Sequence, residues 1–197
     1  HGASSGWDIL NDLTLNCATA AGGCYSRQGG SIKDLTVIGD VLLTTGTLQT
    51  HEADDTSPAT CTFGSLHINT NGIYDATSGT TTITSEADSA YAIKIQGGST
   101  FTHNSGTVAV TTPASTLIKI TENNIYNYIM NAAGQSHELV DNTIIVNDLT
   151  ITAGTLEPYG AEYTIDVNGD VNIASDGTLG KTTTNAAFEF GSLFIAN

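Results

Sequence analysis

The feature that most constrains this chain is an internal repeat, in which three sequence blocks return in the same order. NDLT at 11–14 returns at 147–150, and VIGDVLLTTGTL at 37–48 returns as VNGDVNIASDGTL at 167–179. FGSLHIN at 63–69 returns as FGSLFIA at 190–196. Long-range self-similarity is typical of a repeat architecture, in which each unit covers the next. We therefore divide the chain into an N-terminal segment (1–10), a first repeat copy (11–146) and a second, truncated copy (147–197) of one continuous solenoid.

A shorter rhythm of strand-like fragments lies within each copy. Fragments such as LTVIG, TTTIT and DVNIA alternate apolar with polar residues and are separated by Gly, Asn, Asp and Ser turn signals. Short strands at about ten-residue spacing are typical of a β-sandwich or a β-solenoid. The internal repeat favours an all-β parallel β-helix, with the β-sandwich as the alternative. Val, Ile and Leu should then face inward, and Thr, Asn and Asp outward. The stacked equivalents of FGSL and GDV should lie on the same faces of their respective copies, and a turn of helix is expected only within 131–142.

Composition excludes several functions. Asp and Glu number 20, Lys and Arg only 5, and the formal net charge is −15. Nucleic-acid binding needs clustered cations, so no nucleic-acid partner is expected. Anionic membrane surfaces are disfavoured for the same reason, and no apolar run approaches the roughly 20 residues of a membrane span. With 39% apolar residues, the chain is not a disordered acidic tail either.

Three phrases resemble a repetitive family of β-solenoid proteins of marine phage tail fibres, other virion surfaces and related secreted bacterial proteins. They are GIYDATSGTTTITSE (72–86), NDLTITAGTL (147–156) and FGSLHIN (63–69), and the resemblance extends loosely over 11–197. It implies a structural protein located outside the cell or on a virion surface, with receptor contact as a further role. It carries no catalytic motif, and the segment 120–141 departs from the simple repeat.

The cysteines predict at most one disulfide. Cys17 and Cys24 lie close together in a Gly- and Ala-rich stretch, which suits either a small disulfide ring or free thiols, and Cys61 is left over. A ring would fit an oxidising, extracellular setting. The chain starts at His1 without Met or a signal-peptide pattern, which indicates a processed secreted product, a tag scar or a piece of a longer protein.

Carboxylates are the main catalytic candidates. Glycosidases place two carboxylates across the scissile bond, and Asp54, Asp55, Asp166, Asp170 and Asp176 are acids at loop tips and strand ends. Asp also favours such turns for its own backbone hydrogen bonds, which is the simpler explanation. Scattered single cations disfavour a lyase, and neither a G-x-S-x-G elbow nor an evident Cys–His arrangement is present. We therefore expect no enzyme, with a polysaccharide-degrading enzyme as the remote alternative.

Two metal hypotheses follow from ligand chemistry. Calcium takes carboxylate and turn-carbonyl oxygens, and its weak candidate ligands are Asp54, Asp55, Asp170 and Asp176. No EF-hand or nonapeptide calcium repeat is present. We therefore expect no cofactor, with calcium as the alternative. An N-terminal His1 resembles the copper-chelating residue of lytic polysaccharide monooxygenases. That alternative needs a second, facing histidine, and a tag scar or processing site explains His1 more simply.

Aromatic residues leave a glycan-binding alternative open. Tyr74, Tyr91, Tyr126 and Tyr128 predict either a sugar-stacking strip on one solenoid face or packing against neighbouring rungs. A strip would make the protein an adhesin or a receptor-binding module for a cell-surface glycan.

Assembly is the function that the repeat favours most. The second copy breaks off after FGSLFIAN, where the first copy continues into GIYDATSGTTTITSE. A strand edge with unpaired backbone groups invites strand addition. We therefore expect a homo-oligomer, either a fibre or ring of chains joined end to end or, as the main alternative, a side-by-side trimer. The residues expected at an end-to-end contact are Trp7, Leu13, Leu15, Phe190, Leu193 and Ile195.

Overall fold

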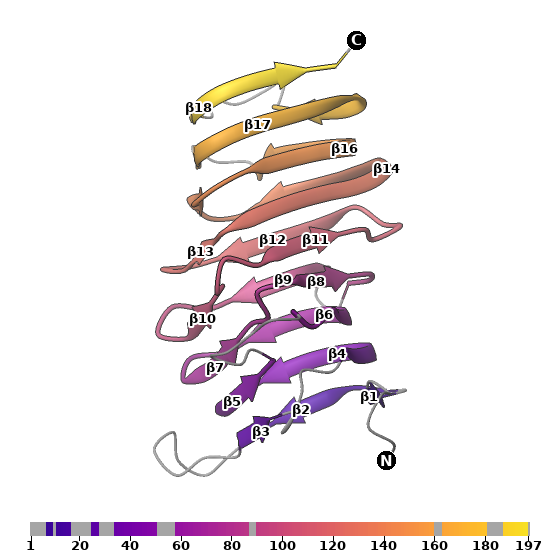
Figure 1. The fold of residues 1–197 in the computed structure, drawn as a ribbon, viewed down its shortest axis with the longest axis vertical. Coiled ribbons are helices and arrows are strands. Elements are labelled where there is room, and N and C mark those ends of the chain that lie inside the picture. Colours follow the sequence, from indigo (N-terminus) through magenta and orange to yellow (C-terminus); the bar gives the residue numbers. More distant parts are fainter. Residues whose placement is uncertain are drawn as a thin grey trace.

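The strands of this protein stack along one axis into a solenoid (Figure 1). The computed structural model describes residues 7–9, 11–16, 25–27, 34–50, 58–86, 90–159, 163–180 and 187–196. Within these ranges all regular secondary structure is β-strand, and all strand pairs are parallel. The predicted all-β parallel solenoid is confirmed, and the alternative β-sandwich is wrong.

The chain winds around three sides, which we call A, B and C. Strands pair with strands of their own side in neighbouring turns, except that β10 and β13, successive on side C, end two separate sheets. Side A contains β1 (Trp7–Ile9), β8 (Thr80–Ile83) and β11 (Thr107–Val110). Side B contains β2 (Leu13–Leu15), β9 (Tyr91–Ile95) and β12 (Thr116–Ile120). Side C contains β3 (Tyr25–Arg27), β5 (Gly46–Gln49), β7 (Gly72–Asp75), β10 (Thr100–Thr102), β13 (Asn124–Ile125) and β15 (Thr143–Ile145). Longer strands bend around corners and serve more than one side: β4 (Leu35–Leu43), β6 (Cys61–Ile68), β14 (Asn127–Leu139), β16 (Leu149–Pro158), β17 (Thr164–Leu179) and β18 (Ala187–Ile195).

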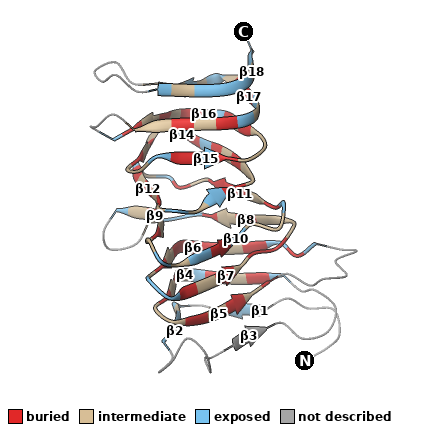
Figure 2. Ribbon diagram, turned by 90° about the vertical axis from the view of Figure 1, so that its left-hand side faces the viewer, coloured by how far each residue is buried: buried red, intermediate tan, exposed pale blue. Residues whose placement is uncertain are grey.

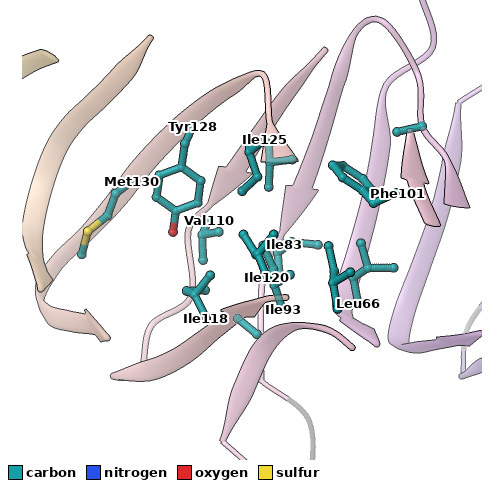
Figure 3. Close-up of a cluster of buried hydrophobic side chains, with 14 of the residues drawn as sticks. Leu66, Ile83, Ile93, Phe101, Val110, Ile118, Ile120, Ile125, Tyr128 and Met130 are labelled. Atoms are coloured by element: carbon teal, nitrogen blue, oxygen red, sulfur yellow. The ribbon is translucent and has the colours of Figure 1, made fainter. Parts of the chain in front are cut away.

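Inward side chains form columns along the axis, as the sequence pattern predicts. On side A, Val37, Phe63, Ile83, Val110 and Met130 occupy equivalent positions in successive turns, and each is 0% exposed. Because side chains alternate across a strand, every second residue enters the interior while its neighbour faces solvent. Figure 2 shows this alternation of burial along the strands, and Figure 3 shows part of the apolar interior.

The turn of helix expected within 131–142 is absent, so that expectation was wrong. Residues 131–139 instead belong to β14, where Ala132, His137 and Leu139 are buried. The register against β16 shifts near Gly134, whose φ of 73° favours glycine. Strands β12 and β16 pair with the two edges of this segment, whereas a single helical turn would leave most of its backbone groups without partners.

In each copy GDV and FGSL stack on the same face, as predicted, and they do so with the same register. Asp40 of the first GDV lies opposite Ser65 of FGSL, and Ser65 Oγ donates a hydrogen bond to Asp40 Oδ1 at 2.7 Å. Asp170 of the second GDV lies opposite Ser192, whose hydroxyl donates to the Asp170 carboxylate. The two corners lie on different edges of the solenoid. The first joins side A to side B, and the second joins side C to side A.

Candidate assembly site

The C-terminal end of the solenoid presents apolar side chains to solvent. Leu193 and Ile195 lie in register with Val171 and Ile173, which are only 0% and 8% exposed. In contrast, Leu193 is 42% and Ile195 63% exposed, because no described residue stacks beyond them. Phe190, in the inward column of side C, is 40% exposed. We call Phe190, Leu193 and Ile195 the apolar end.

The opposite end of the solenoid is formed by β1 and β2. Their side chains Ile9, Leu13 and Leu15 are partly buried and pack against the core. Leu13 and Leu15 pair with the second half of β4, and the backbone of Trp7 pairs with its first residue. The structure thus places the two groups of predicted contact residues at opposite ends of the stack (Figure 1).

The sequence of the N-terminal turn occurs again inside the chain, where it stacks on the turn before it. The segment TIIVNDLTI at 143–151 matches WDILNDLTL at 7–15 position by position around the shared NDLT. It stacks on 125–130, where Asp148 N donates to Asn127 Oδ1 at 3.2 Å and Leu149 lies opposite Tyr128. An NDLT rung therefore has a known mode of stacking on the rung before it.

Asp170, one of the predicted calcium ligands, has a local structural role. Its carboxylate accepts a hydrogen bond from Ser192, and its backbone N–H donates to Asp148 Oδ1 at 2.9 Å. The first copy repeats this ladder, because Asp40 N donates to Asp12 Oδ1 at 2.9 Å. These side chains hold successive turns together at a corner.

The other acidic candidates do not converge on one site. Asp166 lies on side C opposite Glu189, and Asp176 lies farther along β17, exposed and opposite Ala153. Among the described ranges, no group of three His, Cys, Asp or Glu side chains lies close enough to hold a metal ion. Asp54, Asp55 and His1 lie outside the described residues.

The cysteine prediction also falls largely outside the described residues, which include neither Cys17 nor Cys24. Cys61 is a free, fully buried thiol on side A. Burial raises the pKa of this thiol to about 11. Because the thiolate is the reactive form, Cys61 is a core residue rather than a nucleophile at neutral pH.

The tyrosine strip considered as a sugar platform does not form. Tyr74 and Tyr128 are only 0% and 2% exposed, so these two pack against neighbouring rungs. The ring of Tyr74 lies between Phe63 and Phe101, with centroid distances of 5.9 and 5.8 Å. Sequence periodicity could have placed both tyrosines inside, since each stands at an inward position of its strand.

A polar hollow of about 400 Å³ beside side C was not anticipated from the sequence. At this hollow the His103 ring stacks on Tyr126, with 5.3 Å between centroids, and burial lowers the pKa of His103. Asn104, Ser105 and Glu122 adopt positive φ values of 45°, 60° and 58°, a strained conformation that is enriched at functional sites. The only sequence signal was the turn-like HNSG. The hollow is lined by Phe101, Thr102, His103, Asn104, Ser105, Glu122, Asn123 and Asn124.

These features define the chain by class as an acidic, all-β parallel solenoid with an apolar end. Comparisons with protein-family models, with curated proteins and with solved structures found no match. In the described part of the chain, no helix is long and apolar enough to cross a membrane.

Proposed function

We propose that this protein is a non-enzymatic structural component of an extracellular fibre or a virion surface, and that its solenoids join end to end by strand addition. The observation that carries the proposal is the apolar end. Its side chains lie in inward columns, but they are exposed to solvent. Full burial of one Leu, Ile or Phe side chain contributes about 1.5–3 kcal/mol. Stacking of a further turn would therefore gain several such contributions. The proposed location of the protein, in an extracellular fibre or on a virion surface, follows from the resemblance to fibre repeats.

The register of the proposed contact follows from the junction inside the chain. Ser192 in β18 and Asn127 in β14 occupy equivalent positions. Each directly precedes an inward residue of the same column of side A, Leu193 and Tyr128 respectively. A second chain that stacks its NDLT rung on β18 would place Leu13 over Leu193 and Leu15 over Ile195. The N–H of Asp12 would then donate to Ser192 Oγ, as Asp148 N donates to Asn127.

The same register opposes two negative charges. Asp8 of one chain would lie opposite Glu189 of the next, in the column that also contains Asp166. Neighbouring strands are about 4.8 Å apart, and like charges directly opposite destabilise strand pairing. Because salt screens exposed charges, association should strengthen as ionic strength rises. The proposed contact needs no cofactor.

A pair of matched variants tests the assembly. Ile195→Asp puts a charge into the apolar end, whereas Ile38→Asp changes a residue of the same type and similar exposure (63% and 60%) that lies outside the proposed contact, one turn in from the N-terminal end. Sedimentation velocity over a concentration series, with electron microscopy of the largest species, should show end-to-end oligomers for the unchanged chain and for Ile38→Asp. Ile195→Asp should remain monomeric, because burying an unpaired charge is unfavourable.

Two results would contradict this proposal. One is an unchanged chain that stays monomeric at the highest concentration reached, and the other is an equal loss of assembly in both variants. Circular dichroism of each variant checks that the solenoid still folds.

The polar hollow favours a second function, glycan binding. Sugars bind in hollows that combine polar groups with an aromatic surface. Here His103, which lines the hollow and stacks on Tyr126, supplies an aromatic ring. A glycan array probed with the full chain separates the two functions from an enzyme. Retention without turnover supports an adhesin, and depolymerisation of any polysaccharide overturns the non-enzymatic proposal.

A further inference from the structure

The outer face of side A carries an ordered array of threonines. Thr36, Thr62 and Thr82 lie opposite one another in successive turns. The residues directly before and after each of them are buried, so the threonines lie on the outer face. The same turns also present Thr80, which lies opposite Thr107 in the next turn. In a parallel sheet, such residues repeat at about 4.8 Å between strands and about 6.7 Å along a strand. The array is therefore regular in two directions.

The hydroxyl groups in this array are free to bind solvent. Thr36, Thr62, Thr80 and Thr82 have no hydrogen-bond partner within the described part of the molecule, whereas many other threonines are bonded to the backbone. Thr84, for example, donates to Phe63 O at 3.1 Å. Each array residue thus offers one uncommitted hydroxyl and one methyl group.

From Thr36 to Asn172 the central column of side A is also uncharged, in a chain whose net charge is −15, and its one described charged residue, Asp8, lies at the N-terminal end opposite Thr36. The other two sides are different, since Lys94 and Lys119 stack on side B and Asp166 and Glu189 on side C. Charged side chains bind water strongly and would disturb an ordered water layer. The described outward residues of this column are, in order, Asp8, Thr36, Thr62, Thr82, Ala109, Ile129, Thr150, Asn172 and Phe194.

Two other occupants fit this face less well. Sugar rings need aromatic platforms, and the central column contains none from Thr36 to Asn172; its one described aromatic residue, Phe194, lies at the C-terminal end, away from the threonines. A second protein copy would find too little area. From Thr36 to Thr150 the strip is about 24 Å long and about 10 Å wide, on the order of 250 Å². A stable protein interface buries about 800 Å² per partner.

We propose that the outer face of side A adsorbs to ice. Hexagonal ice presents a rigid, neutral array of oxygens whose repeat along one axis is close to the spacing between strands. Threonine hydroxyls held at that spacing can take positions in the lattice, while the methyl groups exclude other water. The rigid backbone of a parallel sheet fixes these groups before binding, which lowers the entropy cost of adsorption. This site is separate from the apolar end and does not depend on assembly.

Matched lysine variants test the proposal. Thr62→Lys and Thr82→Lys put a long charged side chain in the array, and Thr47→Lys makes the same change at a half-buried outward position of side C. The probes are ice itself, through inhibition of ice recrystallisation, and incorporation of the fluorescently labelled full chain into a growing ice crystal. The unchanged chain and Thr47→Lys should be active, and the two array variants should lose activity. Circular dichroism confirms folding of each variant.

Three outcomes would overturn the proposal. The first is no effect of the unchanged chain on ice at any concentration reached, and the second is equal activity in the array and control variants. The third is retention on crystalline cellulose or chitin without adsorption to ice, which would identify a polysaccharide surface instead.

Discussion

Two buried tyrosines differ in how their hydroxyl groups are satisfied. Tyr74 is hydrogen-bonded to Thr50 Oγ1 at 3.2 Å and to Thr81 Oγ1 at 3.1 Å. The hydroxyl of Tyr128 has no partner among the described residues and lies among apolar side chains, including Val110 (Figure 3). A buried polar group without a partner costs free energy, whereas a satisfied one contributes modestly to stability.

We therefore predict opposite effects for two Tyr→Phe substitutions. Tyr128→Phe should leave the free energy of unfolding unchanged or raise it, because it removes a desolvated hydroxyl. Tyr74→Phe should lower it by about 1–3 kcal/mol, because Thr50 and Thr81 lose their partner. Urea denaturation of both variants measures the difference, and an equal loss in the two would contradict this account of the interior.

His137 links stability to pH. It is 0% exposed, neither ring nitrogen has a hydrogen-bond partner in the described part of the chain, and burial lowers its pKa from 6.5 to about 4. Between those values the unfolded chain binds a proton that the folded chain does not, so this residue makes stability fall as the pH drops from 6.5 to about 4. The loss is on the order of 3 kcal/mol, and it levels off below the folded pKa.

The prediction is tested with His137→Leu, which replaces the titratable ring with an apolar side chain. Urea denaturation at pH 7 and at pH 4 should show a smaller decrease in stability for the variant than for the unchanged chain. The carboxylates are common to both proteins, so their contribution cancels in the comparison. An identical pH dependence would show that His137 is protonated without cost in the folded state.

At the scale of the element, the repeated corner explains why GDV and FGSL keep their glycines. The carbonyl oxygens of one rung lie directly against the next glycine. A Cβ at Gly64 would lie 2.5 Å from Gly39 O and 2.6 Å from Ile38 O. At Gly97 the atom nearest to an added Cβ would belong to the flexible carboxylate of Glu122, at 3.2 Å. The corner thus allows close stacking of turns only where a side chain is absent.

We predict that Gly64→Ala destabilises the protein by about 1–3 kcal/mol, the usual cost of overpacking a site whose neighbours are backbone. Gly97→Ala is the matched control and should change stability much less, because the Glu122 side chain can move. Thermal denaturation of the two variants followed by circular dichroism tests this. Equal melting temperatures would mean that the corner backbone shifts without cost.

At the scale of the whole molecule, the ends differ from every other part of the stack. Each turn of a solenoid contacts only its neighbours, so inward side chains meet solvent where the stacking stops. Leu193 is exposed for this reason, although Val171, one turn earlier in the same column, is completely buried. The assembly experiment with Ile195→Asp and Ile38→Asp belongs to this scale, because it asks whether a turn of another chain stacks on this end.

Charged and polar side chains are distributed unevenly over the three sides of the solenoid. Outward columns are built from residues that lie far apart in the sequence. Stacking pairs Lys94 with Lys119 and Glu138 with Glu157 on side B, Asp166 with Glu189 on side C, and Thr36 with Thr62 and Thr82 on side A. The ice experiment belongs here, since no single strand contains the proposed surface.

The sequence by itself determined the local rules of this protein. Alternation of apolar and polar residues identified the strands and their inward positions, and the NDLT, GDV and FGSL blocks predicted a solenoid in which GDV and FGSL stack on the same face. Such properties depend on neighbouring residues and on the pleat of a strand, so they can be deduced from short segments.

Tertiary structure alone decided which distant residues share a surface. Turns of the chain differ in length, so the second GDV corner falls on a different edge from the first, and the outward columns cannot be deduced from the repeat. The same winding brought the 101–105 and 122–124 segments together around a hollow, and it aligned Thr36, Thr62 and Thr82. It also decided that the hydroxyl of Tyr74 is hydrogen-bonded while that of Tyr128 has no partner among the described residues, because a side chain's surroundings are set by the turns above and below it rather than by its neighbours in sequence.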